Sequence, residues 1–456
     1  MATKTFKRGL SIPERKHATE GHPNERVPAL KQVVIPIHQH FGAPNVSIVN
    51  VGDTVKRGQK IADAKDPGPM TVPVHASISG TVKKIEPRAL SNNTNGLCIV
   101  IEAAPEDGPA EHDFMPPMDP FTVSKEDALA RIREAGIIGM GGAGFPTHIK
   151  MSPPAGKNID LLIINAAECE AYLTTDEVVM TEKTSQFIEG ITMVMHITGV
   201  KQAVIGIEDN KEHLVPMLEK AVAENPRASG ILVQPLKSKY PQGGEKMLIT
   251  AITGREVPSG GLPMDVGCIV QNVGTLVAIS EAFNEGKPLI ERSLTVTGGA
   301  CKTPKNIIAP IGAAVSDFPE DFMQVDTASL RKIVFGGPMM GVAVASTAVP
   351  IQKNTSGILL LTAKETPTFE ESPCIRCARC INNCPCFLSP VLINNALEAQ
   401  EIDTAQTAGL MDCIECGSCS YVCPARIKLV QRFRVGKQRF RAHQQAAQKA
   451  EAQNKK

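Results

Sequence analysis

Two copies of one cysteine spacing near the C-terminus constrain this chain more than any other feature. The first copy is Cys374-Ile-Arg-Cys377-Ala-Arg-Cys380-Ile-Asn-Asn-Cys384-Pro385, and the second places its cysteines at Cys413, Cys416, Cys419 and Cys423, followed by Pro424. Both copies therefore have the form C-x2-C-x2-C-x3-C-P. Because three close thiols are twice followed by Cys-Pro, we expect this part of the chain to fold around two inorganic groups.

The spacing resembles that of bacterial ferredoxins, in which three close cysteines bind one [4Fe–4S] cluster and the fourth reaches the other. The resemblance predicts one cluster on Cys374, Cys377, Cys380 and Cys423 and a second on Cys413, Cys416, Cys419 and Cys384. Disulfides and zinc are the alternatives. Disulfides would be unusual because the first residues lack the apolar core of a secretion signal, and structural zinc favours two C-x2-C pairs.

Length and composition indicate a globular, multidomain protein. The chain has 456 residues, of which 42% are hydrophobic and 21% charged, so three or four domains are expected. The formal net charge of +1 gives no reason to expect nucleic acid as a partner. It conceals an asymmetry, because residues 426–456 contain ten Lys or Arg and one acidic residue. No apolar run approaches the roughly 20 residues that span a bilayer.

Changes of pattern along the chain predict a fold of the multidomain α/β plus β class. Residues 1–110 are expected to form an extended arm and a β module, because short β-rich runs between Gly, Asn and Pro fill residues 33–103. This module resembles the barrel-sandwich hybrids of lipoyl and biotinyl carriers. A linker is expected at 104–122. Strands and helices then alternate through residues 123–287, beginning with a helix capped by Ser124, which predicts a mainly parallel, Rossmann-like sheet.

Three shorter parts complete the chain. Residues 288–350 return to a strand-like period and resemble the SLBB β-grasp module, and residues 365–430 contain the paired cysteine motifs in a helical, ferredoxin-like domain. Residues 431–456 form a basic tail. Its apolar positions, together with the two residues before it, predict an amphipathic helix docked on an anionic membrane or on a partner subunit, with a solvated tail as the alternative; these positions are Leu429, Val430, Phe433, Val435 and Phe440.

The second informative stretch is a glycine-rich segment inside the α/β part. Gly139, Gly141, Gly142 and Gly144 lie within six residues, and Lys150 follows. A dinucleotide fingerprint should follow a strand and open a helix, whereas this segment follows a helix and precedes a strand predicted at 159–165. Glycines still allow the backbone to approach a phosphate or a flat ring, and a lysine adds positive charge. A merely flexible turn is the alternative.

Polar side chains follow the predicted strand. Asn165, Glu168 and Glu170 come where a buried parallel strand gives way to a loop. Ligands bind at the carboxyl ends of such strands, so these residues are expected to face a cofactor, with a solvated loop as the alternative.

Both segments resemble loops of the NADH- and FMN-binding subunit of complex I. GMGGAGFPT at 139–147 is similar to its GRGGAGFPT, and NAAECEAY at 165–172 is similar to its NADEGEPG. The resemblance implies that the four glycines and Lys150 cradle FMN. It also implies that Asn165 and Glu168 lie near the isoalloxazine, and that Glu170 helps to position the flavin or the nucleotide.

Two further loops match that subunit in part. Tyr240, Gly243 and Glu245 correspond to its Y-x-x-G-E-E, and Asn272 and Thr275 to its N-N-V-E-T. All five are cofactor-binding candidates by this resemblance. The sequence departs from the complex I pattern at five positions, which concern individual nucleotide contacts: Met140, Ala167, Gly244, Gln271 and Gly274.

The order of these parts is similar over nearly the full length to the RnfC subunits of the Rnf complexes, the membrane-bound ferredoxin:NAD oxidoreductases coupled to ion transport. The resemblance implies an NADH-linked flavin/iron–sulfur oxidoreductase subunit with FMN, two [4Fe–4S] clusters and NAD(H), and with no catalytic side chain of its own. A flavin converts hydride transfer into the single-electron steps of clusters. The implied partners are the other subunits and, indirectly, ferredoxin, and the implied location is peripheral, on the cytoplasmic face of the inner cell membrane.

Two other functions are compatible with parts of this pattern. A cobalamin reductase of microcompartments shares the flavin loop, the SLBB module and the cluster pair, but lacks the leading β module. A non-catalytic electron-transfer or assembly subunit would have an α/β domain without flavin.

Overall fold

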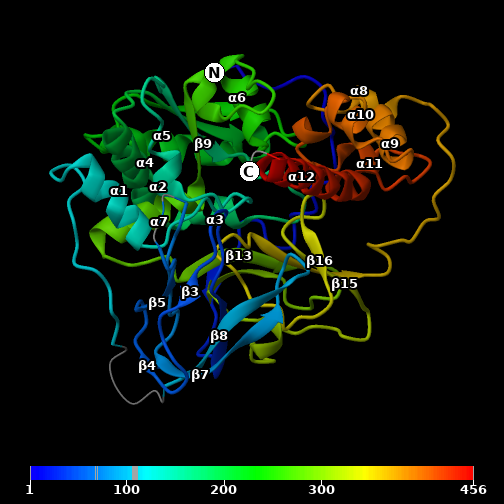
Figure 1. Cartoon of the computed structure of the whole chain (residues 1–456). Coiled ribbons are helices and arrows are strands. Elements are labelled where there is room, and N and C mark those ends of the chain that lie inside the picture. Colours follow the sequence, from blue (N-terminus) through cyan, green and yellow to red (C-terminus); the bar gives the residue numbers. More distant parts are fainter. Residues whose placement is uncertain (1, 67, 69, 105–110, 455–456) are drawn as a thin grey trace.

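The computed structural model describes residues 2–66, 68, 70–104 and 111–454. It contains a β module, an α/β domain, a mixed-sheet domain and a helical cluster domain, arranged around one another in Figure 1. The linker expected at 104–122 lies partly outside the described residues. Its described part packs on the α/β domain, because the amides of Met115 and Met118 donate to the carbonyls of Gly286 and Phe283.

The β module consists of two small antiparallel sheets in the orders β2-β8-β7-β4 and β3-β5-β6. Alternate residues of its strands face opposite sides. Ile99 and Ile101 join the main core, whereas Cys98 and Val100 join a small second cluster. The strands are β2 (Gln32–Pro36), β3 (Val46–Ser47), β4 (Thr54–Val55), β5 (Lys60–Asp63), β6 (Val74–His75), β7 (Gly80–Ala89) and β8 (Asn95–Ala103).

The α/β domain has a parallel four-stranded sheet in the order β11-β10-β9-β12, as the alternating pattern predicted. Leu162 and Ile164 of β9 face one core, and Leu161 and Ile163 face another that includes residues of α6, so both faces of the sheet are covered. Ser124 caps α1 as expected, since its hydroxyl accepts from the amide of Asp127. The strands are β9 (Leu161–Ala166), β10 (Ala203–Glu208), β11 (Ile231–Leu236) and β12 (Cys268–Asn272).

The helices of this domain bring several polar loops to the carboxyl ends of the strands. These helices are α1 (Lys125–Glu134), α2 (Thr147–Lys150), α3 (Thr175–Glu182), α4 (Thr184–Thr198), α5 (Val215–Glu224), α6 (Glu245–Thr253) and α7 (Val273–Asn284), with short 3-10 segments at Asp209–Leu214 and Pro263–Val266.

The mixed-sheet domain is a six-stranded sheet in the order β1-β14-β13-β17-β15-β16. It is larger than the range 288–350 predicted from the sequence, because it includes β17 beyond that range and β1 from the start of the chain. β1 pairs in parallel with β14. The strands are β1 (Asn24–Arg26), β13 (Glu291–Thr297), β14 (Lys305–Pro310), β15 (Leu330–Phe335), β16 (Val342–Val344) and β17 (Gly357–Thr362), with a 3-10 turn at Val315–Asp317.

The cluster domain is a small helical unit with its own core, which includes Ile393, Leu410 and Phe433. Its helices are α8 (Arg379–Asn382), α9 (Pro390–Glu398), α10 (Ile402–Thr407), α11 (Ser418–Tyr421) and α12 (Leu429–Asn454), with a 3-10 turn at Leu410–Asp412. Figure 1 shows the long α12 beside the other helices of this domain, and it packs against α9, α10 and α11. None of the described helices combines the length and apolar character needed to cross a bilayer.

Residues 2–30, which we call the N-terminal strap, are largely extended but contain a turn at 17–21, and they pack against the other domains. Lys4 forms a bridge with Leu236 of the α/β domain. Arg8 donates to the carbonyl of Ile381 in the cluster domain at 2.8 Å. Because β1 then joins the mixed sheet, the first residues of the chain connect three domains.

Candidate functional site

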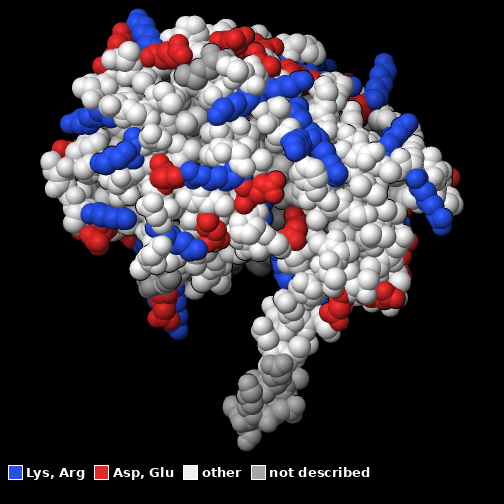
Figure 2. Space-filling model, turned by 90° about the horizontal axis from the view of Figure 1, so that it is seen from above, with Lys and Arg blue, Asp and Glu red and all other residues white. Residues whose placement is uncertain are grey.

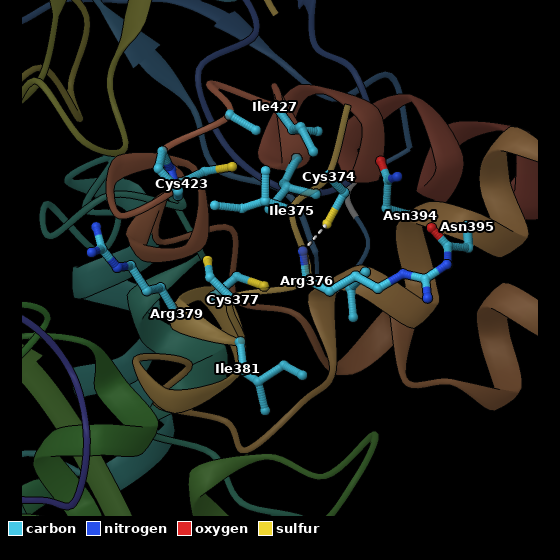
Figure 3. Close-up of a pocket in the computed structure, with 16 residues that line it drawn as sticks. Cys374, Ile375, Arg376, Cys377, Arg379, Ile381, Asn394, Asn395, Cys423 and Ile427 are labelled. Atoms are coloured by element: carbon cyan, nitrogen blue, oxygen red, sulfur yellow. Dashed lines mark hydrogen bonds between the residues drawn. The ribbon is translucent and has the colours of Figure 1, made fainter. Parts of the chain in front are cut away.

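The first cysteine site is a cavity of about 340 Å³ in the cluster domain. Its lining includes three cysteines of the first motif and the last cysteine of the second, namely Cys374, Cys377, Cys380 and Cys423. Figure 3 shows the sulfur atoms of Cys374, Cys377 and Cys423 turned toward a shared space. The structure therefore brings together the four residues that the ferredoxin-like spacing assigned to one cluster.

The second cysteine site is narrower, with a volume of about 20 Å³. It is lined by the complementary set, Cys384, Cys413, Cys416 and Cys419, and also by Cys386. Cys416 and Cys419 are buried. The four thiols of this set therefore line a smaller space than those of the first set.

The two motifs share one backbone conformation. Arg376 and Glu415 follow the first cysteine of their motifs by two residues, and their φ angles are 56° and 58°. Their amides donate to Sγ of Cys374 and Cys413, at 3.4 Å in each case. Hydrogen bonds to cysteine sulfur help to set the potential of a bound cluster. The sequence repeat is thus also a structural repeat, and it orients both sets of thiols in the same way.

The alternatives to clusters are less compatible with the structure. All thirteen cysteines are free thiols, so the disulfide alternative is wrong. Within the described ranges, no group of three or more His, Cys, Asp or Glu converges closely enough to hold a single metal ion. A [4Fe–4S] cluster instead takes one thiolate at each of its four irons, which is the arrangement that a cavity lined by four cysteines offers.

The glycine-rich loop lies against the start of α7. The amide of Met140 donates to Oγ1 of Thr275 at 3.0 Å, and a Cβ added at Gly141 would lie 3.4 Å from Cβ of Asn272. Gly142 has a φ of +142°, and a Cβ added there would meet no atom within 4 Å. The loop therefore leaves open space on the side of Gly142, which is what a ligand cradle requires.

The carboxyl ends of β9 and β12 supply polar groups next to this loop. Asn165 donates from Nδ2 to the carbonyl of Gly243 at 2.8 Å. Asn272 caps α7 through its Oδ1 and donates from Nδ2 to Oδ2 of Asp176 at 2.9 Å. Glu168 is buried and accepts from the amide of Asp176 at 3.0 Å. The structure thus gathers these predicted residues around one edge of the sheet.

Lys150 and Glu245 form a pair at the same edge. Lys150 Nζ lies 2.7 Å from Oε1 of Glu245 and donates to the carbonyl of Val270 at 2.9 Å. Both side chains are partly exposed, with fractions of 24% and 40%. Lys150 is therefore positioned by protein contacts and still accessible to an anionic group.

Two residues predicted to bind a cofactor form hydrogen bonds with other domains instead. Glu170 accepts from the amides of Met339 and Met340 in the mixed-sheet domain at 3.1 and 2.8 Å, and burial raises its pKa to about 7. Tyr240 is 1% exposed, and its hydroxyl donates to the carbonyl of Cys416 at 2.7 Å. Both residues join the α/β domain to its neighbours. Their local sequence resembled a nucleotide loop, and nothing local indicated the distant partners.

Several charged residues near the site were missed by sequence reasoning. Arg292 is buried and donates to the carbonyl of Met140 at 3.1 Å, while burial lowers its pKa to about 10. Burial and the charge of Glu168 raise the pKa of Asp176 to about 7. Lys16 and Lys211 are also buried beside Glu168. These residues come from four separate segments, so no local motif could have predicted their convergence.

Unpartnered buried atoms mark the same edge of the sheet. Among the described residues, Glu168 Oε2, Gln242 Nε2 and Gln271 Nε2 are buried without a hydrogen-bond partner. Buried polar groups are nearly always paired, with protein or with water. Together with the open space at Gly142, these atoms fit a polar ligand with a flat ring, such as a flavin.

The tail differs from the docking helix predicted for it. Leu429, Val430, Phe433 and Phe440 are all buried, the first three in the core of the cluster domain, whereas Val435 is exposed. Most of the predicted apolar face therefore contacts the protein itself. Lys437 is also buried and pairs with Oε1 of Glu415 at 2.9 Å. Residues 441–448 are exposed. Figure 2 shows this end of the molecule standing clear of the body.

Two truncations should distinguish the buried start of α12 from its exposed end. Deleting residues 432–456 removes Phe433 and Lys437, which pack on the loop of Cys413, so we expect loss of iron from the second cysteine site. Deleting residues 443–456 removes only the part beyond these contacts, and iron content should match the full chain. Iron quantification on both proteins measures this difference. Equal iron in the two truncated proteins would contradict the packing role.

Three family models match the chain. They are described as the RnfC barrel sandwich hybrid domain at residues 4–106, the Nuo51 FMN-binding domain at 132–281, and a 4Fe-4S dicluster domain at 366–446. The chain therefore contains an FMN-binding domain and a domain for two [4Fe–4S] clusters, as predicted.

Curated relatives are similar over most of the chain. The C subunit of the proton-translocating ferredoxin:NAD(+) oxidoreductase complex of Clostridium ljungdahlii is 43% identical over 96% of this chain and 94% of the relative. Its Na(+)-translocating counterpart in Acetobacterium woodii is 41% identical over 95% and 96%. The C subunit of the ion-translocating oxidoreductase complex of Vibrio cholerae is 39% identical over 89% of this chain, which spans 52% of that relative.

Fold and site together define a flavin and iron–sulfur electron-transfer protein. The chain belongs to the RnfC family, the C subunits of the ion-translocating ferredoxin:NAD oxidoreductase, or Rnf, complexes. This assignment confirms the resemblance drawn from the sequence.

Proposed function

We propose that this chain is the subunit through which an ion-translocating ferredoxin:NAD oxidoreductase complex exchanges electrons with NAD(H). Electrons would pass between the nucleotide, FMN and two [4Fe–4S] clusters. The support is the family membership together with one contact of the structure. Tyr240 lies in a loop beside the edge of the parallel sheet at which the flavin would bind. Its hydroxyl donates to the carbonyl of Cys416 in the second cysteine site.

The flavin site would use the groups gathered at the carboxyl ends of β9 and β12. Gly139, Gly141, Gly142 and Gly144 would allow close approach of the backbone, and Lys150 would contribute positive charge. Asn165, Glu168, Gly243, Asn272 and Thr275 hold the surrounding loops through the hydrogen bonds described above. When bound, FMN would accept a hydride and release single electrons. We assign Glu170, Tyr240 and Glu245 supporting roles, through their contacts with Met340, Cys416 and Lys150.

The contact between domains supports an order for the two clusters. Tyr240, Cys416, Cys169 and Met339 share one apolar cluster at the junction of the α/β and cluster domains. The group on Cys413, Cys416, Cys419 and Cys384 would therefore lie nearer the flavin. Cys374 and Cys377 of the other site are exposed, and so is Ile375 between them. We infer that the group held there exchanges electrons with a partner protein of the complex.

Reduction by nucleotides tests the proposal. NADH should reduce the flavin of the purified protein under anaerobic conditions, and both clusters should follow. We expect NADPH to react at least about tenfold more slowly, which corresponds to about 1.4 kcal/mol. Arg292 reaches the glycine loop, but it is buried and its guanidinium donates to Met140 and Thr355.

The measurement is stopped-flow absorbance at the flavin and cluster bands, with dithionite as a control for cofactor competence. A protein that dithionite reduces and NADH does not would refute the nucleotide role while leaving the cofactors in place. Equal rates with NADH and NADPH would contradict only the selectivity.

Attachment to the complex is part of the same proposal. The relatives are named as subunits of translocating complexes, and we infer that this chain also assembles with membrane subunits, peripherally and on the cytoplasmic face. Ferredoxin would then deliver electrons to other subunits, and these electrons would reach this chain only through them. Because the apolar face of α12 is occupied, the exposed surface around Ile375 is the better candidate for contact with a partner.

A further inference from the structure

Lys16 of the N-terminal strap lies inside the α/β domain. Its side chain is 3% exposed, and its ammonium donates to the carbonyls of Glu168 at 2.5 Å and of Leu173 at 2.7 Å. The same ammonium lies 3.9 Å from Oε2 of Glu168. A residue from the beginning of the chain thus clamps the segment that follows β9 and supplies a counter-ion to its carboxylate.

A buried cation needs a reason in terms of charge, because desolvation disfavours the ammonium. Burial and the neighbouring Lys211 lower the pKa of Lys16, whereas Glu168 opposes this effect. Lys211 is buried too, and among the described residues its Nζ has no hydrogen-bond partner. Lys16 and Lys211 therefore share two buried carboxylate neighbours, Glu168 and Glu208. Within the described part of the chain, Oε2 of Glu168 has no hydrogen bond.

We propose that Lys16 is a positioning residue for the flavin, and that its charge tunes the reduction potential of FMN through Glu168. The inference rests on the proposed function, in which Glu168 is one of the residues that surround the flavin site. An uncompensated carboxylate beside a flavin disfavours the addition of electrons, because the two negative charges repel. The ammonium of Lys16 reduces that repulsion, and its hydrogen bonds to the carbonyls of Glu168 and Leu173 hold the segment that carries the carboxylate.

The test uses variants that separate charge from shape. Lys16→Gln keeps a donor for the two carbonyls but removes the charge, and Lys16→Arg keeps both. In K16Q we expect the equilibrium between bound FMN and a reference dye to shift at least about threefold toward oxidised flavin. K16R should stay near the wild type. Lys4→Gln is the matched control, because Lys4 belongs to the same strap and donates to the carbonyl of Ile252, away from the site.

Each result has a defined meaning. A flavin potential in K16Q equal to that of the wild type would overturn the inference. If K16Q does not fold, the double variant K16Q/E168Q removes both charges of the pair and should restore folding, since a buried charge without its partner is the costly state. Its flavin potential should equal that of E168Q alone, and a difference would show that Lys16 does not act through Glu168. Wild-type protein without any FMN would instead refute the proposed function itself.

Discussion

Cys384→Ser should remove one cluster and leave the other, so that iron content falls to about half of the wild-type value. Cys384 belongs to the first motif in sequence, but in the structure it lies with Cys413, Cys416 and Cys419. A serine hydroxyl is a poor substitute for the thiolate that a cluster iron prefers. The variant should therefore lose the cluster nearer the flavin, and electrons from NADH should stop at FMN.

Double variants show which cluster is lost. Adding Cys413→Ser to C384S should cause no further loss of iron, because both residues serve the same cluster. Adding Cys377→Ser should remove the remaining iron. Cys386→Ser is the control, since this cysteine lines the same cavity only two residues away but has no place in the ligand set. If C384S and C377S together lose no more iron than C384S alone, the crossed assignment is wrong.

Gly142→Val should nearly abolish FMN binding while both clusters assemble normally. Gly142 has a φ of +142°, which an L side chain rarely adopts, and the space beside it is open only because no side chain is present. A valine there combines backbone strain of about 1–3 kcal/mol with a branched group in the flavin cradle. We expect the flavin content of purified protein to fall below about a tenth of wild type, because each 1.4 kcal/mol is tenfold in affinity.

The control for this variant separates the effect of backbone strain from the effect of a side chain that blocks the flavin site. Gly156 has a φ of +87° and also has no atom within 4 Å of an added Cβ, but it lies outside the proposed cradle. Gly156→Val should cost stability and keep FMN. Flavin fluorescence after denaturation, together with thermal unfolding, measures both effects. Equal flavin content in the two variants would remove Gly142 from the site.

Features encoded in short stretches of sequence could be predicted. The cysteine spacing predicted three close thiols at each of two sites. The structure places Cys423 with the first three and Cys384 with the second three, as the resemblance to ferredoxins implied. Alternating strands and helices predicted the parallel sheet of the α/β domain. Asn165 and Glu168 were expected at the end of a strand, and Asn272 was a candidate through its resemblance to a complex I loop. The register between β9 and β12 places Asn165 opposite Asn272.

Long-range pairing could not be predicted in the same way. Nothing near Lys16 indicates a partner more than 150 residues away, since a lysine in a polar segment is usually solvated. Tyr240 and Glu170 lie in loops that resemble nucleotide contacts, but their bonds are to Cys416 and to Met340. The apolar residues of α12 were predicted to share a helix face, and a pattern of this kind does not specify which surface will cover that face.

The pairing of β1 with β14 has a consequence for the order in which contacts form while the chain is being synthesised. Asn24 leaves the ribosome long before its neighbour Asn306, and Arg8 must wait longer still for Ile381. The segment that contains Lys16 therefore gains its contacts with β14 and Ile381 only after most of the chain has been synthesised. Until then its contacts with the α/β domain, including those of Lys16 with Glu168 and Leu173, hold it alone. We expect this interval to be the period in which flavin enters most easily, and a chain arrested before β14 to exchange its flavin freely.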